Sequence, residues 1–205
     1  MSQAGAKAVK TGSSSLERGS LLAAVHRPED WPKRMPPSIA FGGRSNVGKS
    51  TLLNRLIGAS SARTSKTPGR TRGVYLYDSG EGWVAADLPG FGFAKTSREA
   101  RSSWSELAGA FFREHPPHLT VQLIDPKIPT SDYDLEFRDY LHDLRIASVV
   151  VATKADRLSQ SDRSRSRKQI ESDFGPLLFV SAKTGEGIEI LRKQIRQALA
   201  ERGRE

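Results

Sequence analysis

The segment at residues 43–50, Gly-Arg-Ser-Asn-Val-Gly-Lys-Ser, contains the residue types that bind phosphate groups. Its two glycines allow the backbone to curl so that successive N–H groups point inward, and a following helix adds the positive end of its dipole. Lys49 would then contact the β and γ phosphates of a nucleotide, and the Ser50 hydroxyl would bind Mg²⁺. The segment predicts a nucleoside-triphosphate site with the candidate residues Gly43, Arg44, Ser45, Asn46, Val47, Gly48, Lys49, Ser50 and Thr51.

Three shorter motifs later in the chain indicate which nucleotide is bound. Asp87 ends a predicted strand, where its carboxylate can hold a magnesium-bound water and the Gly90 amide can meet the γ phosphate. Asp156 follows another predicted strand, where it can accept hydrogen bonds from the N1–H and N2 amino groups of guanine. Adenine lacks this pair of donors, a mismatch of ~1–3 kcal/mol, so the pattern favours guanine nucleotides over adenine nucleotides. The candidate residues are Asp87, Leu88, Pro89 and Gly90, then Thr153, Lys154, Ala155 and Asp156, then Val180, Ser181 and Ala182.

Each motif has a plainer interpretation when it is taken alone. A glycine-rich turn can carry a lysine by coincidence, Asp-Pro-Gly is a common turn, and Thr-Lys-x-Asp is a surface loop in most proteins. Position favours the nucleotide site, because the glycine-rich segment lies between a predicted strand and a predicted helix.

Strands and helices that alternate along the chain must position these motifs. Such alternation predicts an α/β fold with a mostly parallel sheet, helices on both faces and ligands at the carboxyl ends of the strands. The runs at 73–79 and 82–90 predict a hairpin, which makes one strand antiparallel. The expected strands are 37–43, 73–79, 82–90, 119–125, 147–154 and 176–182, and the expected helices are 50–58, 97–115, 132–144, 159–173 and one that carries Ile188, Leu191, Ile195 and Leu199.

Length and composition favour one globular domain. The chain has 205 residues, of which 37% are apolar and 27% charged, and it has no cysteine. Residues 1–20 are small and polar, so we expect a disordered tail followed by a domain at 21–205. No stretch approaches the ~18 apolar residues of a membrane helix and no secretory signal is visible, so we expect a cytoplasmic protein without membrane contact. We also expect a monomer.

Together the motifs resemble those of translation-factor-type GTPases, and three longer stretches are more specific. FGGRSNVGKSTLLNRL, SKTPGRTRG and DLPGFGFAK resemble the EngB (YihA/YsxC) family of ribosome-biogenesis GTPases, in the TrmE-Era-EngA-EngB-Septin-like superfamily. The resemblance implies a three-layer Ras-like P-loop GTPase domain with a six-stranded sheet, which binds GTP or GDP with Mg²⁺. It implies Thr71 as a second Mg²⁺ ligand, with Thr67 as the alternative, in a switch I segment formed by Gly69, Arg70, Thr71, Arg72 and Gly73.

The resemblance also bears on the rate of GTP hydrolysis. Ras-like signalling GTPases orient the attacking water with a glutamine after the switch II glycine, but Phe91 occupies that position here. Since an aromatic ring cannot orient water, we expect slow intrinsic hydrolysis that a partner accelerates. By resemblance the candidate catalytic residues are Lys49, Thr71 and Asn46, and Asn46 would bind K⁺. Alternatively, Asn46 only fits the turn.

Basic residues indicate an anionic partner. The formal net charge is +9, and an excess of this kind speeds encounter with phosphate-rich molecules. The two basic clusters are Arg63, Lys66, Arg70 and Arg72 in the predicted switch I loop, and Arg157, Arg163, Arg165, Arg167 and Lys168 after Asp156. The alternatives are that the first cluster attracts GTP itself and that the second is a solvated helix face.

The resemblance implies that the anionic partner is the large ribosomal subunit, bound through rRNA. The protein would then be a switch in subunit assembly, linked to normal cell division and septation. The alternative is a regulatory guanine-nucleotide-binding module without a ribosomal role.

Overall fold

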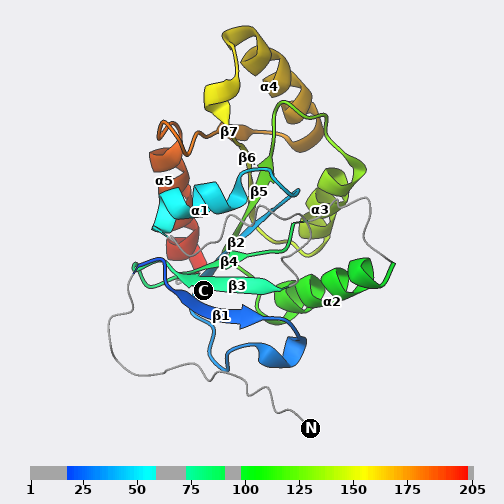
Figure 1. Ribbon diagram of the computed structural model, residues 1–205, viewed down its shortest axis with the longest axis vertical. Helices are drawn as coiled ribbons and strands as arrows, with labels where there is room; N and C mark the ends of the chain where they lie inside the picture. Colours follow the sequence, from blue (N-terminus) through cyan, green and yellow to red (C-terminus); the bar gives the residue numbers. More distant parts are fainter. Residues whose placement is uncertain (1–17, 59–72, 91–97, 203–205) are drawn as a thin grey trace.

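The computed structural model describes residues 18–58, 73–90 and 98–202, and of residues 98–105 and 202 only the backbone. Within these ranges the chain forms one seven-stranded sheet flanked by five α-helices (Figure 1). No helix in these ranges is long and apolar enough to cross a membrane.

From residue 38 onward, the strands and α-helices follow the expected order. The strands are β1 (Leu21–Val25), β2 (Ser38–Gly43), β3 (Val74–Asp78), β4 (Val84–Asp87), β5 (Leu119–Ile124), β6 (Ser148–Ala152) and β7 (Leu177–Phe179). The helices are α1 (Lys49–Ile57), α2 (Arg98–Glu114), α3 (Asp132–Asp143), α4 (Gln160–Phe174) and α5 (Ile188–Arg202), with short 3-10 helices η1 (Pro28–Asp30) and η2 (Ala155–Arg157).

The sheet has the strand order β1-β3-β4-β2-β5-β6-β7. Neighbouring strands from β4 to β7 are parallel, while β3 is antiparallel to both β4 and β1. One strand therefore runs against the other six, as the predicted hairpin requires. Because β2, β4, β5, β6 and β7 run the same way, their carboxyl ends share one edge of the sheet, where the predicted motifs follow.

The sheet differs from the expected one by an added strand at its N-terminal end. The sheet has seven strands instead of six, because Leu21–Val25 pairs with β3 as an edge strand. Directly before this strand, the Gly19 N–H donates to Asp78 O and the Asp78 N–H donates to Ser20 O. Residues 1–17 lie outside the described residues. The short run LLAAV has no polar and apolar alternation, so only its pairing with β3 identifies it as a strand.

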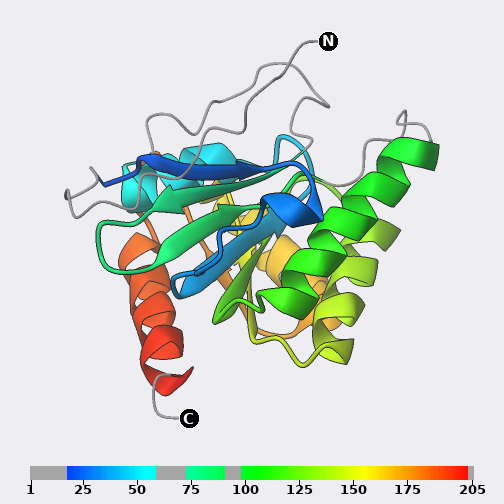
Figure 2. The ribbon, with the colours of Figure 1, turned by 90° about the horizontal axis from the view of Figure 1, so that it is seen from below.

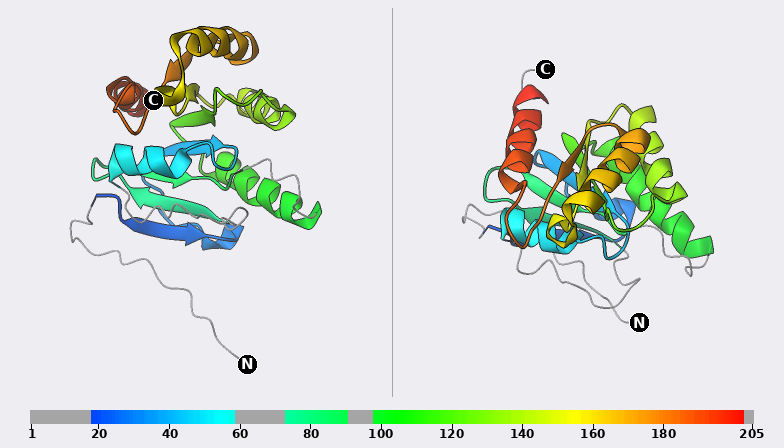
Figure 3. Two further views of the ribbon diagram at one scale, coloured as in Figure 1. Left: turned by 45° about the horizontal axis from the view of Figure 1, so that its top comes forward. Right: turned by 90° about the horizontal axis from the view of Figure 1, so that it is seen from above.

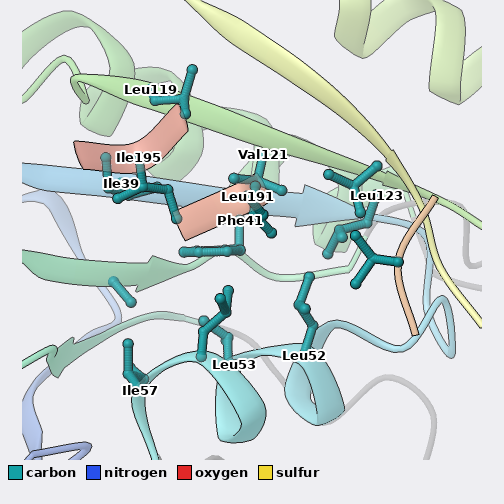
Figure 4. Packing of buried hydrophobic residues seen from close by; sticks show 14 of the residues in the cluster. Ile39, Phe41, Leu52, Leu53, Ile57, Leu119, Val121, Leu123, Leu191 and Ile195 are labelled. Atoms are coloured by element: carbon teal, nitrogen blue, oxygen red, sulfur yellow. The ribbon is translucent and has the colours of Figure 1, made fainter. Parts of the chain in front are cut away.

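Helices cover both faces of the sheet, which confirms the expected three layers. Buried residues of α1 and α5 pack on one face, and those of α2 and α3 pack on the other (Figure 2). In β2, Ile39 and Phe41 belong to the first core and Ala40 to the second, as the alternation of a strand requires. Figure 4 shows Phe41 of β2 in this first core, together with Leu52 and Leu53 of α1 and Leu191 of α5. The helix α4 lies at the end of the sheet opposite β1 (Figure 3).

Candidate nucleotide-binding site

Three loops at the carboxyl edge of the sheet form the candidate site. The phosphate loop (residues 43–50) connects β2 to α1, and the TKAD loop (153–157) follows β6. The SAK loop (181–187) follows β7 and precedes α5. The segment after β4 completes the site.

Backbone packing shapes the phosphate loop. Gly43 is the last residue of β2, and a Cβ there would lie 2.7 Å from the carbonyl oxygen of Leu123 on β5. Gly48 has a φ of 106°, which side-chain-bearing residues rarely adopt, and α1 begins directly after it at Lys49. The fold therefore requires both glycines of the motif, one at each end of the loop.

Asp87 and Gly90 lie against the phosphate loop. The parallel pairing of β4 with β2 places Asp87 opposite Phe41, and the Asp87 carboxylate forms an ion pair with the Lys49 ammonium group. The two side chains are only 8% and 11% exposed, so water screens their attraction weakly. A Cβ on Gly90 would lie 3.2 Å from the Ser45 backbone nitrogen. A lysine suited to phosphate and a carboxylate suited to a metal-bound water thus occupy neighbouring positions.

The TKAD loop is bonded directly to the phosphate loop. The Thr153 hydroxyl donates to the carbonyl oxygen of Val47 at 2.5 Å. The Lys154 ammonium group donates to the carbonyl oxygen of Asn46 at 2.7 Å and to the Asp125 carboxylate at 2.8 Å. Lys154 itself has a φ of 56°, in the left-handed region. A ligand seated on the TKAD loop would therefore be held at a defined distance from the phosphate loop.

The SAK loop orients Asp156. The Ser181 hydroxyl donates to Asp156 Oδ1 at 2.7 Å and accepts a hydrogen bond from the Thr184 N–H at 3.1 Å. The hydrogen bond from Ser181 lowers the pKa of the Asp156 carboxyl below its ordinary value, and the positive charges of Lys183 and Arg157 lower the pKa further. Asp156 is exposed and ionised at neutral pH, in a state that can accept two hydrogen bonds from a base.

Five predicted residues can contribute less through their side chains than the others. Val47, Leu88, Ala155 and Val180 are buried in the cores, so they can offer a ligand only backbone groups. Thr51 is exposed on the first turn of α1.

Asp125 is a site residue that the sequence analysis missed. It directly follows β5. Its Oδ2 atom accepts the hydrogen bond from Lys154, and its Oδ1 atom accepts one from the Lys127 N–H at 3.1 Å. The available signal was its position, because it follows a buried strand at the same edge as the other motifs.

Part of the predicted switch region lies outside the described residues. This holds for Thr67, Gly69, Arg70, Thr71 and Arg72, for the other members of the first basic cluster, and for Phe91. Gly73 is described and lies against β1, where a Cβ would be 2.5 Å from the carbonyl oxygen of Val25. Strand packing therefore accounts for the glycine at this position.

Three arginines of the second basic cluster form ion pairs with carboxylates on α4 or in the SAK loop. The pairs are Arg163 with Glu186 at 2.6 Å, Arg165 with Asp162 at 3.8 Å, and Arg167 with Glu171 at 2.9 Å. Pairing reduces the positive charge that this helix can offer to a partner. This favours the solvated helix face that was left open as an alternative.

The fold and the convergent loops define the chain as a Ras-like α/β protein with a P-loop nucleotide site. A family model described as a 50S ribosome-binding GTPase matches residues 38–154. The probable GTP-binding protein EngB of Thermotoga maritima is 35% identical over 187 residues, covering 88% of this chain and 96% of that protein. EngB of Syntrophomonas wolfei is 38% identical over 169 residues, covering 80% and 87%. A crystal structure of a probable GTP-binding protein engB gives a TM-score of 0.67 at 28% identity, covering 80% and 99%.

The chain belongs to the EngB family of GTP-binding proteins and is a GTPase. The predicted family, fold and enzyme class are thereby confirmed. Guanine nucleotide is the ligand of this family, and Mg²⁺ typically accompanies it in GTPases.

Proposed function

We propose that this GTPase is a nucleotide-controlled switch that assists assembly of the large ribosomal subunit and, through it, normal cell division. The observation that supports the proposal is the match of residues 38–154 to a family described as 50S ribosome-binding. This segment holds both the phosphate loop and the start of the TKAD loop. Assembly of ribosomal subunits places the proposed action in the cytoplasm.

In the proposed complex, one guanine nucleotide spans the loops. Lys49 contacts the β and γ phosphates, and Asp156 accepts hydrogen bonds from the guanine N1–H and N2 amino groups. The stem of Lys154 lies along the base, while its ammonium group stays on Asn46 O and Asp125. The backbone amide of Ala182 donates to guanine O6.

The described residues fit Mg²⁺. The Ser50 hydroxyl on the first turn of α1 and the Asp87 carboxylate at the end of β4 are the hard oxygen donors that Mg²⁺ prefers. Mg²⁺ in phosphate sites takes few protein ligands beside phosphates and water, so the lack of a larger acidic or histidine cluster among the described residues is compatible with it. When bound, the ion neutralises charge on the phosphates. Thr71 is the proposed second protein ligand.

K⁺ dependence stays a prediction. Asn46 has a φ of 63°, in the left-handed region that asparagine adopts more readily than most residues. The turn thus accounts for this asparagine without an ion. Hydrolysis rates in K⁺ and Na⁺ at equal ionic strength would separate the two roles, because only a K⁺ ligand makes the rates differ.

We assign the proposed rRNA contact to the first basic cluster, at 63–72, instead of α4. Three arginines of the second cluster are paired with carboxylates, whereas the segment from 58 to 77 contains no acidic residue. A contact through phosphates would make the affinity fall steeply with salt.

The test of the proposed function is GTP hydrolysis by the full chain with and without purified large ribosomal subunits. We expect saturating large subunits to raise the rate by about tenfold or more, since a partner that supplies a catalytic group can give still larger factors. Small subunits serve as the control and should leave the rate unchanged. A rate that large subunits do not alter would support the nucleotide-binding module without a ribosomal role.

A further inference from the structure

Arg163 on α4 contacts both loops that surround the proposed guanine pocket. Its guanidinium group donates to the two carboxylate oxygens of Glu186, at 2.6 and 2.9 Å, in the bidentate arrangement that fixes both partners. The same group lies 3.5 Å from the carbonyl oxygen of Ala155. Ala155 precedes Asp156 in the TKAD loop, and Glu186 belongs to the SAK loop. One side chain outside the pocket therefore joins the two loops.

Glu186 is connected to the proposed base contact through the SAK loop. Its carbonyl oxygen accepts a hydrogen bond from the Ser181 N–H at 3.0 Å, and the Ser181 hydroxyl donates to Asp156. The next residue, Gly187, has a φ of 73°, and a Cβ there would lie 2.2 Å from the carbonyl oxygen of Phe179. The C-terminal end of the SAK loop is thus held at two neighbouring residues: Gly187 packs against β7, and Glu186 binds Arg163.

The guanidinium group of Arg163 is itself oriented by packing. Its central carbon lies 5.1 Å from the centre of the Phe179 ring, and this ring is only 5% exposed. Arg167, one turn later, lies 5.0 Å from the same ring but pairs with Glu171 of its own helix. Arg167 is therefore a matched control, because it has the same residue type and ring contact but its ion pair lies within α4 instead of with either loop.

We propose that Arg163 and Glu186 form a latch that joins the SAK loop to the TKAD loop and thereby sets how long a guanine nucleotide stays bound. The inference rests on the proposed guanine pocket. Both residues are positioning residues, because they act on the base through Ala155, Ser181 and Asp156. Their side chains are 34% and 39% exposed, so we expect an effect on nucleotide dissociation of about threefold to tenfold, larger than for a simple exposed pair but modest.

The experiment measures dissociation of GDP carrying a fluorescent methylanthraniloyl group from the full-length chain. Arg163→Ala and Glu186→Gln should each speed dissociation by about threefold to tenfold, and the double variant should be no faster than either one. Arg167→Ala should dissociate at the wild-type rate. The charge-swapped pair, Arg163→Glu with Glu186→Arg, should recover part of the lost lifetime. The kcat at saturating GTP should stay at the wild-type value, because the latch does not contact the phosphates.

Two results would overturn the latch itself. The first is wild-type dissociation from both Arg163→Ala and Glu186→Gln, and the second is equal acceleration by Arg167→Ala, which would assign the effect to packing on Phe179. Asp156→Asn with xanthine and guanine nucleotides is measured alongside. If this variant changes base preference while the latch variants do nothing, the latch alone fails. If Asp156→Asn has no effect on base preference, the proposed pocket fails and the latch fails with it.

Discussion

The phosphate loop and the two base loops are built in different ways. The phosphate loop is shaped by close backbone packing, with Gly43 against Leu123 and Gly48 at a positive φ. The TKAD and SAK loops are held by polar side chains that reach between segments, as Lys154 does to Asp125 and Ser181 does to Asp156. Substitutions that add volume should therefore damage the first part of the site, and substitutions that remove charge should damage the second.

This contrast has one exception, and it carries the largest expected effect. Lys49→Ala leaves the Asp87 carboxylate buried without its partner, and breaking a buried ion pair costs ~3–5 kcal/mol. We expect a fall of this size in the free energy of unfolding, measured with urea, together with loss of GTP binding.

A double variant, Lys49→Met with Asp87→Asn, separates these two consequences. Removing both charges should recover most of the lost stability while GTP binding stays absent. If Lys49→Ala alone is as stable as the wild type, the ion pair is solvated. Removal of charge then destabilises no part of the phosphate loop, and the contrast between the loops holds throughout.

Gly43→Ala tests the backbone packing of the phosphate loop. The new methyl group would meet the Leu123 backbone at 2.7 Å, and overpacking of this kind costs ~1–3 kcal/mol. We expect lower thermal stability and at least a tenfold loss of nucleotide affinity, about 1.4 kcal/mol. Gly82→Ala is the control, because no atom lies within 4 Å of the added carbon; unlike Gly43, Gly82 has a positive φ of 81°, which an alanine would strain. The control should lose some stability and no affinity.

Asp125→Asn tests the side-chain link at the base loops. Hydrogen bonds to charged groups contribute ~1.5–3 kcal/mol, so weakening the bond to Lys154 should lower GDP affinity by about tenfold in calorimetric titrations. Asp139→Asn removes an exposed carboxylate that pairs with Arg138 on α3, and it should leave the affinity unchanged. Equal affinities for both variants would show that Lys154 is positioned by Asn46 alone.

The smallest expected effect is a shift in pH dependence. The Ser181 hydrogen bond lowers the pKa of Asp156. The carboxylate that binds guanine is therefore ionised above the ordinary value of 3.8, stays ionised below that value, and is lost only as the pH falls through the lowered pKa. Ser181→Ala should raise this pKa, so that the carboxylate is protonated at a higher pH. Carboxyl NMR titration of Asp156 measures the shift directly, and an unchanged midpoint would contradict the role of Ser181.

Patterns local in the sequence were enough to predict most of the fold. The strand, glycine turn and helix around the phosphate loop were predicted with their boundaries within about one residue, because apolar periodicity and glycine positions reflect local geometry. The edge strand β1 was missed because pairing with β3 defines it. Arg163 was assigned to an RNA-binding cluster because its partner, Glu186, lies 23 residues away in the chain.

The sequence by itself determined the nucleotide class, the strand and helix order and the family, since each depends on contiguous motifs whose residue types imply their chemistry. Only the tertiary structure decided which charges meet. It joined Lys49 to Asp87, Lys154 to Asp125 and the Asn46 carbonyl, and Arg163 to Glu186. The physical reason is that the parallel strands bring their carboxyl ends to one edge of the sheet, so side chains distant in sequence become neighbours there.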